Sequence, residues 1–567
     1  MCNLPLIGID FGTSYSMISS FNRETKKPEL IKYGDSENIP TLISCSVDQN
    51  RQISYKFGID SSTNTIFDIK RMIGVPYNSN NLEKIHHFWK EEGMKLQPIF
   101  DESNKNRESC NVNICVNNTD NINDQIWETS ENIVGNYLKW LIKDVAGIDI
   151  SIKQKVVITI PSDFTTNQRK AILKAGEIAG LKRDNITLLH EPSASALTYL
   201  QLEENKNKSF ENLLVCDFGG GTFDLSLLAV SQTSFDVKYV SGDRYLGGRD
   251  FDQKIYQWFC DTYQKDGIKI SQNDKVKIIK QCQEAKEKLS FENEAEIQIE
   301  NKKIVLTREM FNSYCCDLIE RIKSVINQTL NEYEISVNDI DGVLLVGGSS
   351  QIPIFQEEIM KIFGREKILE FYYKKESIAI GACYLAAIND GTLKTKNRKK
   401  NYNQRLAHSI GIESLEIDTK ESYLSKILLK NSAVPCQGYG HFTNVYDTDR
   451  MIYLIYEGDG YHVTDDGFIG SLDQNNLPFT PANQMKITIT MSIDENGILE
   501  TKGFVEGSGE VYLKSDLAIK CKIFNDILEL SQINSSYPVE FRKNEKDCEE
   551  HLRWLTTARM KLLQINK

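Results

Sequence analysis

The sequence predicts an α/β protein with a duplicated fold, followed by an all-β domain and a short helical tail. Three observations support this prediction. Short β-branched runs alternate with amphipathic stretches from Leu6 to about Ala387, two similar glycine-rich turns lie about two hundred residues apart, and strand-like runs with tight turns come after them. At 567 residues the chain is also too long for one compact core.

The α/β domain is expected to occupy residues 1–388. Val156–Pro161 (VVITIP) is rich in β-branched residues and indicates a strand. The next segment, Asn167–Leu181, has apolar residues at helical spacing, and Lys275–Leu289 has the same pattern with a charged outer face. This alternation is typical of sheets covered by helices.

Each half of this domain has an acidic, glycine-rich turn after an apolar strand: Ile7–Ser14 (IGIDFGTS) and Leu213–Asp224 (LLVCDFGGGTFD). Glycine lets backbone N–H groups approach a ligand, and successive N–H groups form a concave anion site. Asp10 and Asp217 would repel phosphate, but they can hold Mg²⁺ through its waters. One such turn is more often a flexible hairpin. Two of them predict a phosphate clamp made by duplicated halves.

A third glycine turn, Gly347–Ser350, ends the apolar strand Val343–Val346. Its glycines suit the close approach of a nucleoside. The alternative is an ordinary strand-to-helix turn, so only the other two turns favour a binding role for this one.

Composition excludes several classes of function. The net charge of −12 argues against nucleic acid or an anionic membrane as the main partner. No apolar stretch approaches the roughly 18 residues of a transmembrane helix, and the N-terminus (MCNLP) lacks a secretory signal. The 13 cysteines are scattered without CxxC pairs, so we expect inert thiols in a reduced, cytoplasmic location.

The remaining chain is expected to form three parts. Residues 389–405 are polar and basic and predict an interdomain linker, with a localisation signal or an anion-binding patch as the alternative. Residues 406–514 carry strand-like runs such as Met451–Tyr456, separated by Asp-Gly and Asn-Gly turns, and predict an all-β domain. Residues 515–567 are expected to be helical in pieces.

Several motifs together resemble the DnaK-type heat shock protein 70 chaperones. The resemblance implies an actin-like (ribonuclease H-like) ATPase domain followed by a β-sandwich domain that binds peptides. The motifs are Ile7–Tyr15, Asp68–Gly74, Val157–Phe164, His190–Ser195, Val215–Asp224, Gly242–Asp252 and Val346–Pro353, with fainter matches at Ser409–Glu413, Tyr456–Gly458 and Ile493–Leu499.

The resemblance also implies how ATP and Mg²⁺ would be bound. Lys70 would stabilise charge on the γ-phosphate, which Thr222 would contact, while Glu191 and Asp217 would orient the attacking water and the hydrated Mg²⁺. Without their motifs, Lys70 and Glu191 would more often be surface salt-bridge residues. The implied metal positions, through water, are Asp10, Asp217 and Asp224, and the implied nucleotide positions are Gly12, Thr13, Ser14, Tyr15, Gly219, Gly220, Gly221, Gly247, Gly248, Lys286, Ser290, Gly347, Gly348 and Ser349.

The sequence departs from this family at the positions that would contact the adenine base and at the segments that would couple the two domains. Glu287 and Gln351 stand where the family has two arginines that sandwich adenine, so weaker ATP binding is expected. Gln283 replaces an acidic residue at the ribose. The linker is basic rather than leucine-rich, and Thr187 replaces an arginine that docks it, whereas Arg169 of the interlobe switch is retained.

In the β domain, the resemblance implies a channel for extended apolar peptides. The alternative is that the same residues form an ordinary sandwich core. The tail of residues 515–567 is short for a complete helical lid. The channel positions are Ile412, Leu415, Val445, Ile452 and Ile493.

The resulting hypothesis is an ATP-dependent chaperone that binds unfolded or extended polypeptide clients. Its expected partners are J-domain and nucleotide-exchange cochaperones, with no nucleic acid and no membrane. One alternative is a nucleotide-binding holdase or exchange-type regulatory relative with little ATP turnover, which the altered adenine positions and the basic linker favour. The other is a small-molecule kinase or filament-forming protein of the same superfold, which the β domain disfavours.

Overall fold

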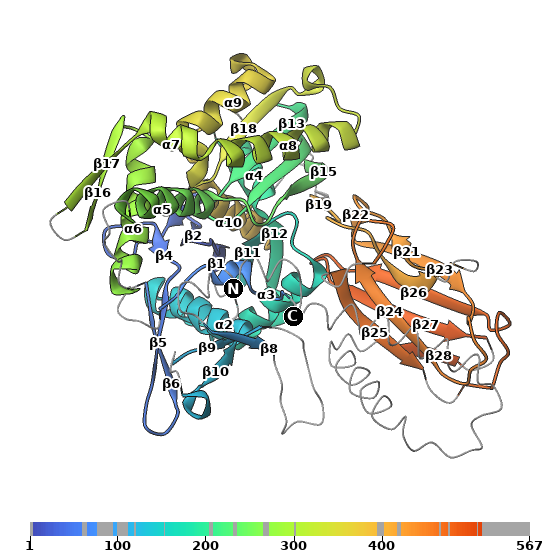
Figure 1. The fold of residues 1–567 in the computed structure, drawn as a ribbon. Coiled ribbons are helices and arrows are strands. Elements are labelled where there is room, and N and C mark those ends of the chain that lie inside the picture. Colours follow the sequence, from blue (N-terminus) through green and yellow to red (C-terminus); the bar gives the residue numbers. More distant parts are fainter. Residues whose placement is uncertain are drawn as a thin grey trace.

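The computed structural model describes most of the chain up to Tyr512 (Figure 1). The tail predicted to be helical, residues 515–567, lies outside the described part, and so do residues 394–401 of the predicted linker. The described residues are 4–58, 65–75, 95–98, 112–117, 121–151, 154–202, 208–230, 235–264, 272–299, 302–393, 402–416, 421–463, 467–474, 477–506 and 509–512.

The first lobe is built on a sheet with the order β12-β11-β1-β2-β3, and β4 pairs with β2. Strand β1 runs parallel to β11 and antiparallel to β2, which is antiparallel to β3. Helices α2 and α3 cover one face of this sheet, and α10 covers the other. The bounds are β1 Leu6–Asp10, β2 Tyr15–Asn22, β3 Lys27–Leu30, β4 Ile39–Pro40, β11 Lys155–Ile160, β12 Ile186–His190, α2 Ser130–Trp140, α3 Thr166–Ile178 and α10 Ser377–Asn389.

The second lobe repeats this arrangement around the sheet β18-β13-β14-β15. Strand β13 runs parallel to β18 and antiparallel to β14, which is antiparallel to β15. The two sheets thus share one pattern of strand orientations, and the predicted mixed α/β fold is confirmed. The bounds are β13 Phe210–Phe218, β14 Phe223–Val230, β15 Phe235–Asp243, β16 Glu294–Ile299, β17 Lys302–Thr307, β18 Gly342–Val346, α4 Glu191–Gln201, α5 Gly248–Gln264, α6 Gln272–Leu289, α7 Arg308–Tyr314, α8 Cys316–Glu332 and α9 Pro353–Phe363.

Helices α4 and α10 pack against each other between the two sheets. A Cβ atom added to Gly381 would lie 1.9 Å from the carbonyl oxygen of Ala194, and one added to Gly8 would lie 2.3 Å from the backbone nitrogen of Cys383. Only glycine allows these close approaches. The helix pair therefore holds the ends of β1 and β13, where the acidic turns begin, at a fixed separation.

Two small sheets extend the first lobe, and they lie at the lower left of Figure 1. One has the order β6-β5-β7 and the other the order β10-β9-β8. Aromatic side chains of the first sheet pack on α2, where the rings of Phe57 and Trp140 lie 5.3 Å apart. The bounds are β5 Ile43–Val47, β6 Ile53–Phe57, β7 Thr65–Ile66, β8 Leu96–Pro98, β9 Val112–Cys115 and β10 Trp127–Thr129.

The C-terminal strands form a β domain of two antiparallel four-stranded sheets around one core, drawn in orange at the right of Figure 1. The sheets have the orders β21-β20-β24-β25 and β23-β26-β27-β28. Alternate residues of β26 and β27 are buried, as expected for strands with one face in a core. The bounds are β20 Ile410–Leu415, β21 Ser422–Leu428, β23 Cys436–Phe442, β24 Met451–Glu457, β25 Phe468–Gln474, β26 Ile487–Ile493, β27 Leu499–Val505 and β28 Gly509–Tyr512.

The end of the predicted linker is a strand. Residues Tyr402–Arg405 form β19, which pairs in parallel with β15 of the second lobe and antiparallel with β22 (Ala433–Val434). Main-chain hydrogen bonds do not depend on side-chain type, so a polar segment can occupy this position. The β domain is therefore joined to the second lobe through a shared sheet.

The β domain also contacts the first lobe. The carboxylate of Glu457 accepts a hydrogen bond from the N–H of Thr166 at 2.9 Å, at the start of α3, where an anion is favourable. Strand β12 is an edge strand, and its Leu188 donates to Asn496 Oδ1 and accepts from Gln404 Nε2, each at 2.9 Å. Polar side chains thus satisfy the free edge of this sheet.

Among the described residues, no helix combines the length and the apolar character needed to span a membrane.

Candidate functional site

The two acidic turns predicted from the sequence face each other across the two lobes. A Cβ atom added to Gly220 would lie 2.6 Å from Ser14 Oγ, and one added to Gly221 would lie 2.3 Å from Thr13 Oγ1. The turns that follow strands β1 and β13 thus lie in contact with each other. Glycine suits these positions because the side chains of Thr13 and Ser14 occupy the space that a Cβ atom would need. Positive φ is found elsewhere in the site, at Gly347 (φ 82°).

Further glycines pack closely within and against the two turns. The N–H of Gly248 donates to the carbonyl oxygen of Gly219 at 3.0 Å, and a Cβ atom on Gly247 would lie 2.5 Å from the carbonyl oxygen of Gly220. A Cβ atom on Gly12 would lie 1.9 Å from the carbonyl oxygen of Tyr15. Each of these predicted nucleotide-binding glycines belongs to the packed turns, so a larger residue would displace the turn itself.

One buried ion pair crosses the floor of the site. Lys70 Nζ lies 2.5 Å from Glu191 Oε1, and the two side chains are 5% and 6% exposed. Glu191 is the first residue of α4, directly after β12. Lys70 lies in the short 3-10 helix Ile69–Arg71, which follows Asp68 in the left-handed conformation (φ 54°). Two segments 121 residues apart in the chain are thereby brought together.

The loop that carries Lys70 is fastened to the second lobe by contacts that the sequence analysis missed. Arg71 donates to the carbonyl oxygen of Gly221 at 2.8 Å and pairs with Asp250 at 2.7 Å. Arg249 pairs with Asp68 at 3.1 Å. Arg71 and Arg249 lie inside motifs that the sequence analysis quoted, so the sequence marked the two segments. Nothing in the sequence identifies the partners of these arginines.

Three buried aspartates, Asp10, Asp217 and Asp224, lie near this ion pair, and we call these three residues and Glu191 the acidic floor. Burial is the largest influence on the pKa of each aspartate. Burial raises the pKa of Asp10 to about 6, although the Lys70 ammonium opposes this. Burial, together with Asp163 and Glu191, raises the pKa of Asp224 to about 7. Burial and the neighbouring carboxylates raise the pKa of Asp217 well above its ordinary value.

The ion pair itself titrates in the same environment. Burial raises the pKa of Glu191 to about 7, against the opposing charge of Lys70. Burial lowers the pKa of Lys70, but the carboxylates of Glu191 and Asp10 outweigh that effect, so its net shift is upward. Lys70 therefore stays charged while the acids around it bind protons readily.

The acidic floor fits a hydrated divalent cation. Among the described residues, Asp217 Oδ2 and Asp224 Oδ2 are buried without a hydrogen-bond partner, while Asp224 Oδ1 accepts from Ser162 N and Oγ. Four carboxylates face one ammonium, an excess of negative charge that a divalent cation would balance. The described residues contain no group of three or more His, Cys, Asp or Glu that could hold a metal ion by themselves.

The predicted nucleoside residues also come together. Lys286 on α6 donates to the carbonyl oxygen of Gly248 at 2.8 Å and pairs with Asp252 at 2.7 Å. Ser349 Oγ donates to the carbonyl oxygen of Gly219 at 2.8 Å, and Ser290 Oγ to that of Lys286 at 3.4 Å. The third turn therefore packs directly on the second.

One side-chain hydrogen bond joins the lobes beside the turns. Tyr15 in the first lobe accepts a hydrogen bond from Gln283 Nε2 on α6 at 3.1 Å. Thr222 is buried, and its carbonyl oxygen accepts from the N–H of Gly219 at 3.0 Å. All the predicted phosphate and nucleoside positions thus belong to one region between the lobes.

The predicted peptide channel is not assembled in the same way. Ile412 and Ile493 are 3% and 2% exposed and belong to the core of the β domain, whereas Ile452 is 36% exposed. Ile412 pairs with Ile455 across β20 and β24, and Ile452 lies three residues from Ile455 on the opposite face. Ile412 and Ile452 therefore lie on opposite faces of one sheet, and the channel that the resemblance implies stays a prediction. Leu415 and Val445 are half-buried.

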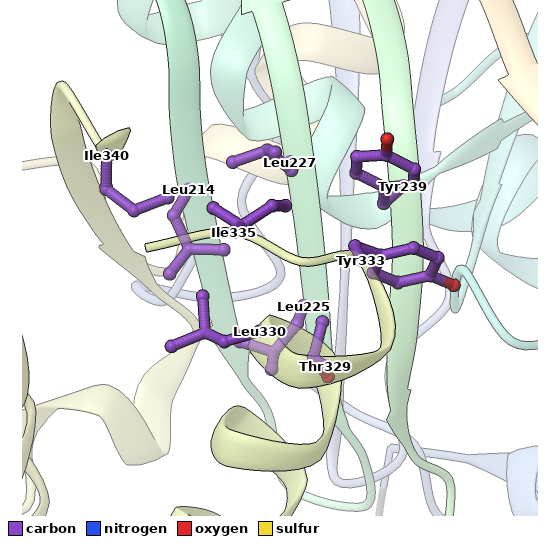
Figure 2. Close-up of a pocket in the computed structure, with 9 residues that line it drawn as sticks. All are labelled: Leu214, Leu225, Leu227, Tyr239, Thr329, Leu330, Tyr333, Ile335 and Ile340. Carbon is purple, nitrogen blue, oxygen red and sulfur yellow. The ribbon is translucent and has the colours of Figure 1, made fainter. Parts of the chain in front are cut away.

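A pocket elsewhere in the molecule carries no comparable chemistry (Figure 2). It lies between α8 and the sheet of the second lobe and is lined mainly by apolar side chains. Two of its polar side chains are hydrogen-bonded within the protein: Thr329 Oγ1 bonds to Ser241 Oγ at 2.9 Å, and Tyr333 Oη accepts from Asn431 at 2.7 Å. The lining residues are Leu214, Leu225, Leu227, Tyr239, Thr329, Leu330, Tyr333, Ile335 and Ile340.

Comparison with known proteins gives consistent matches. The family model described as "Hsp70 protein" matches residues 6–514. Heat shock 70 kDa protein 7, chloroplastic, and heat shock 70 kDa protein 6, chloroplastic, both from Arabidopsis thaliana, are each 28% identical over 535 residues, covering 91% of this chain and 69% of the relative. The stromal 70 kDa heat shock-related protein, chloroplastic, from Pisum sativum, is 27% identical over 532 residues, covering 91% and 70%.

These relatives correct one expectation. All three are chloroplast proteins by name, so the prediction of a cytoplasmic location is wrong on this finding. Scattered, unpaired cysteines indicate only a reducing compartment, and the cytoplasm was one choice among several.

Proposed function

Because the chain belongs to the Hsp70 family, we propose that it is a chaperone that binds and hydrolyses ATP and couples hydrolysis to the binding of extended polypeptide. The family implies an actin-like ATPase fold and a nucleotide site that uses Mg²⁺. The observation that carries the proposal is the buried Lys70–Glu191 pair below two glycine turns that face each other.

The phosphates would lie between the two turns. Backbone N–H groups of Gly12–Tyr15, Gly220 and Gly221 would donate to the phosphate oxygens, with the hydroxyls of Thr13, Ser14 and Thr222 as further donors. Asp10, Asp217 and Asp224 would hold Mg²⁺ through water, and the ion would neutralise charge on the phosphates.

Hydrolysis would be an in-line attack by water on the γ-phosphate. Lys70 would place its ammonium beside the γ-phosphate and stabilise the charge that develops as the phosphoryl group leaves. Glu191 and Asp217 would orient the water, and a carboxyl pKa near 7 at Glu191 suits proton transfer at neutral pH. The released proton would pass to this carboxylate.

The β domain would bind the peptide. Its contacts with both lobes support coupling to the nucleotide site, because β19 continues the sheet of β13 and β15, and Asn496 bonds to Leu188 two residues before His190. The basic linker is no obstacle to this coupling, since backbone pairing carries the connection. J-domain and nucleotide-exchange cochaperones would be the partners that regulate it.

One alternative keeps specific support. Glu287 and Gln351 supply no guanidinium to stack on a base, which favours a regulatory relative that holds nucleotide with little turnover. The small-molecule kinase or filament-forming alternative is set aside, because the family match covers the β domain as well.

Single-turnover ATP hydrolysis by the full chain, with and without an extended apolar peptide, separates these functions. Peptide-stimulated hydrolysis that Lys70→Ala abolishes supports the chaperone. ATP binding without hydrolysis, with or without peptide, would instead establish the regulatory relative.

A further inference from the structure

One histidine lies where three parts of the molecule meet. His408 belongs to the segment between β19 and β20 of the β domain, Arg244 directly follows β15 of the second lobe, and Asp163 lies just after β11 of the first lobe. Arg244 Nε lies 3.2 Å from Asp163 Oδ2, and Arg244 Nη2 lies 3.0 Å from His408 Nε2. The guanidinium of Arg244 therefore connects the β domain to both lobes.

The other ring nitrogen of His408 is held within the β domain. His408 Nδ1 lies 2.9 Å from Asp459 Oδ2, and Asp459 Oδ1 accepts from the N–H of Ser409 at 3.0 Å. The N–H of Gly458 also donates to the carbonyl oxygen of Ser409 at 2.8 Å, so the loop after β24 is fastened beside the ring. His408 thus lies between a fixed acceptor and an arginine of the second lobe.

These two contacts determine the protonation state of the ring. A guanidinium can only donate hydrogen bonds, so Nε2 of His408 must accept from Arg244. Nδ1 then carries the proton and donates to Asp459, which is the neutral form of the ring. In the protonated form both nitrogens are donors, and Nε2–H would face the N–H groups of Arg244. Uptake of one proton therefore breaks the contact with Arg244 and keeps the contact with Asp459.

Both partners of the ring keep their charges over the range in which histidines titrate, about pH 5 to 8. Burial lowers the pKa of Arg244, but the carboxylate of Asp163 outweighs this effect, so the net shift is upward. Burial raises the pKa of Asp459, but the hydrogen bonds from His408 and Ser409 outweigh it and lower this pKa to about 2. The side chain of His408 is 26% exposed, so protons from the solvent can reach the ring.

Further charged groups lie on both sides of these contacts. Lys430 Nζ lies 3.8 Å from Asp459 Oδ2, and Lys426 Nζ donates to the carbonyl oxygen of Asp459 at 2.6 Å. Glu332 of α8 pairs with Lys430 at 2.7 Å. The titratable groups near Arg244 are Asp163, Glu457 and Tyr245. The two lysines share the charge of Asp459, which weakens the attraction of this carboxylate for a proton on His408.

We propose that His408 is a pH-sensitive junction: its neutral form joins the β domain to both lobes through Arg244, and its protonated form releases the β domain. The inference concerns how the domains are joined and goes beyond the proposed function, because it requires no nucleotide. Asp163 follows Ser162, which donates to Asp224 of the acidic floor, so the junction also connects the β domain with the proposed nucleotide site.

Hydrogen exchange of the full chain without nucleotide, followed by mass spectrometry, measures this release. The reporters are the N–H groups of Thr166 and Leu188, which donate to Glu457 and Asn496 of the β domain. The unsubstituted chain is compared with His408→Gln at each pH, because intrinsic exchange rates change with pH and cancel in this ratio. A glutamine can accept from an arginine and donate to an aspartate, and it does not titrate.

The ratio of the two rates, unsubstituted chain over His408→Gln, should rise about tenfold between pH 8 and pH 5.5, because a charge-assisted hydrogen bond is lost. The change in the ratio is the test, so an imperfect fit of the glutamine does not obscure it. A ratio that is the same at both pH values overturns the inference and leaves the proposed function intact.

Two further variants test the residues, each compared with the same variant carrying His408→Gln. Arg244→Gln supplies a side chain that can accept from the protonated ring, so the rise of the ratio at pH 5.5 should disappear. His441→Gln is the matched control, because His441 is an exposed histidine of β23 whose ring contacts Thr488, and it should keep the full rise. A rise that persists in Arg244→Gln, or that is lost in His441→Gln, would overturn the assignment to His408.

Discussion

The ammonium nitrogen of Lys70 lies 2.5 Å from a carboxylate oxygen of Glu191, and both groups are buried in the floor of the site. Asp10, Asp217 and Asp224 are buried nearby, and each is raised in pKa by burial. Of these five residues, Lys70 is thus the one cation, and the other four are acids. A substitution in this cluster should change stability as well as chemistry.

Lys70→Ala should reduce single-turnover ATP hydrolysis by about 100-fold or more, because it removes a charge placed where the γ-phosphate would lie. It should also lower the free energy of unfolding by about 3 kcal/mol, because Glu191 is left buried without its partner. Rapid-quench assays with excess protein and urea titrations measure the two effects.

The double variant Lys70→Ala/Glu191→Gln separates these effects. Without the buried charge it should regain most of the lost stability but none of the turnover. Stability that stays low in the double variant would contradict the account of the ion pair, and turnover that returns would contradict the role of Lys70.

Binding of Mg²⁺ and ADP should release protons near pH 6.5. Burial raises the pKa of Asp10 to about 6 and those of Glu191 and Asp224 to about 7, whereas unfolded Asp and Glu titrate near about 4. Without bound Mg²⁺ and nucleotide, the folded protein therefore binds these protons more tightly than the unfolded chain does. The contribution of these groups to the free energy of unfolding falls as the pH rises from about 4 to about 7. A bound cation favours the carboxylate forms and reverses that loss.

Calorimetry in buffers of different ionisation enthalpy measures the proton count. Release should be larger near pH 6.5 than near pH 8, where the acids are already ionised, and Asp224→Asn should reduce it. Proton uptake on binding, or a count that does not change with pH, would be inconsistent with the raised pKa values.

The two acidic turns could be predicted from the sequence because the signal for a turn is local. A strand, an aspartate and one or more glycines after it specify a turn and its donors without knowledge of the rest of the fold. The fastening of the Lys70 loop could not be predicted, because the Arg71–Asp250 and Arg249–Asp68 pairs exist only once α5 of the second lobe meets that loop.

The channel residues show a second limit. Strand β24 reads MIYLIYE, with apolar side chains on both faces, so its sequence does not reveal which face is buried. A shift of one residue exchanges Ile452 for Tyr453, and the pairing of Ile455 with Ile412 decides between them. The run Met451–Tyr456 indicated a strand, which the structure contains as β24, but it did not indicate which face would be buried.

Gly221→Ala should weaken ADP binding at least about tenfold. The new Cβ atom would lie 2.3 Å from Thr13 Oγ1 and would push the two turns apart, because no real contact is so short. Gly219→Ala is the matched comparison, since its Cβ atom would meet nothing closer than 3.8 Å. Calorimetry should show a much smaller loss for Gly219→Ala; equal losses would mean that spacing of the turns is not what matters.

Asn496→Ala should loosen the β domain from the first lobe. It removes the acceptor for the N–H of Leu188 on an edge strand, an interaction of about 1 kcal/mol. Hydrogen exchange of the Leu188 segment should become faster, and peptide stimulation of hydrolysis should fall. The neighbouring Glu495→Ala serves as control, and equal effects of both variants would show that the turn as a whole, rather than this hydrogen bond, joins the domains.

Substitutions on the two faces of β24 should differ in how much they lower the free energy of unfolding. Ile455→Ala should lower the free energy of unfolding by about 2–5 kcal/mol, because Ile455 fills the core, whereas Ile452→Ala should change it by less than about 1 kcal/mol. Tyr453→Phe should leave stability unchanged or raise it by about 1 kcal/mol, because the Tyr453 hydroxyl is buried and bonds to no described residue. Urea titrations of the three variants decide the register: a large loss at Ile452 with little loss at Ile455 would place the other face of the strand in the core.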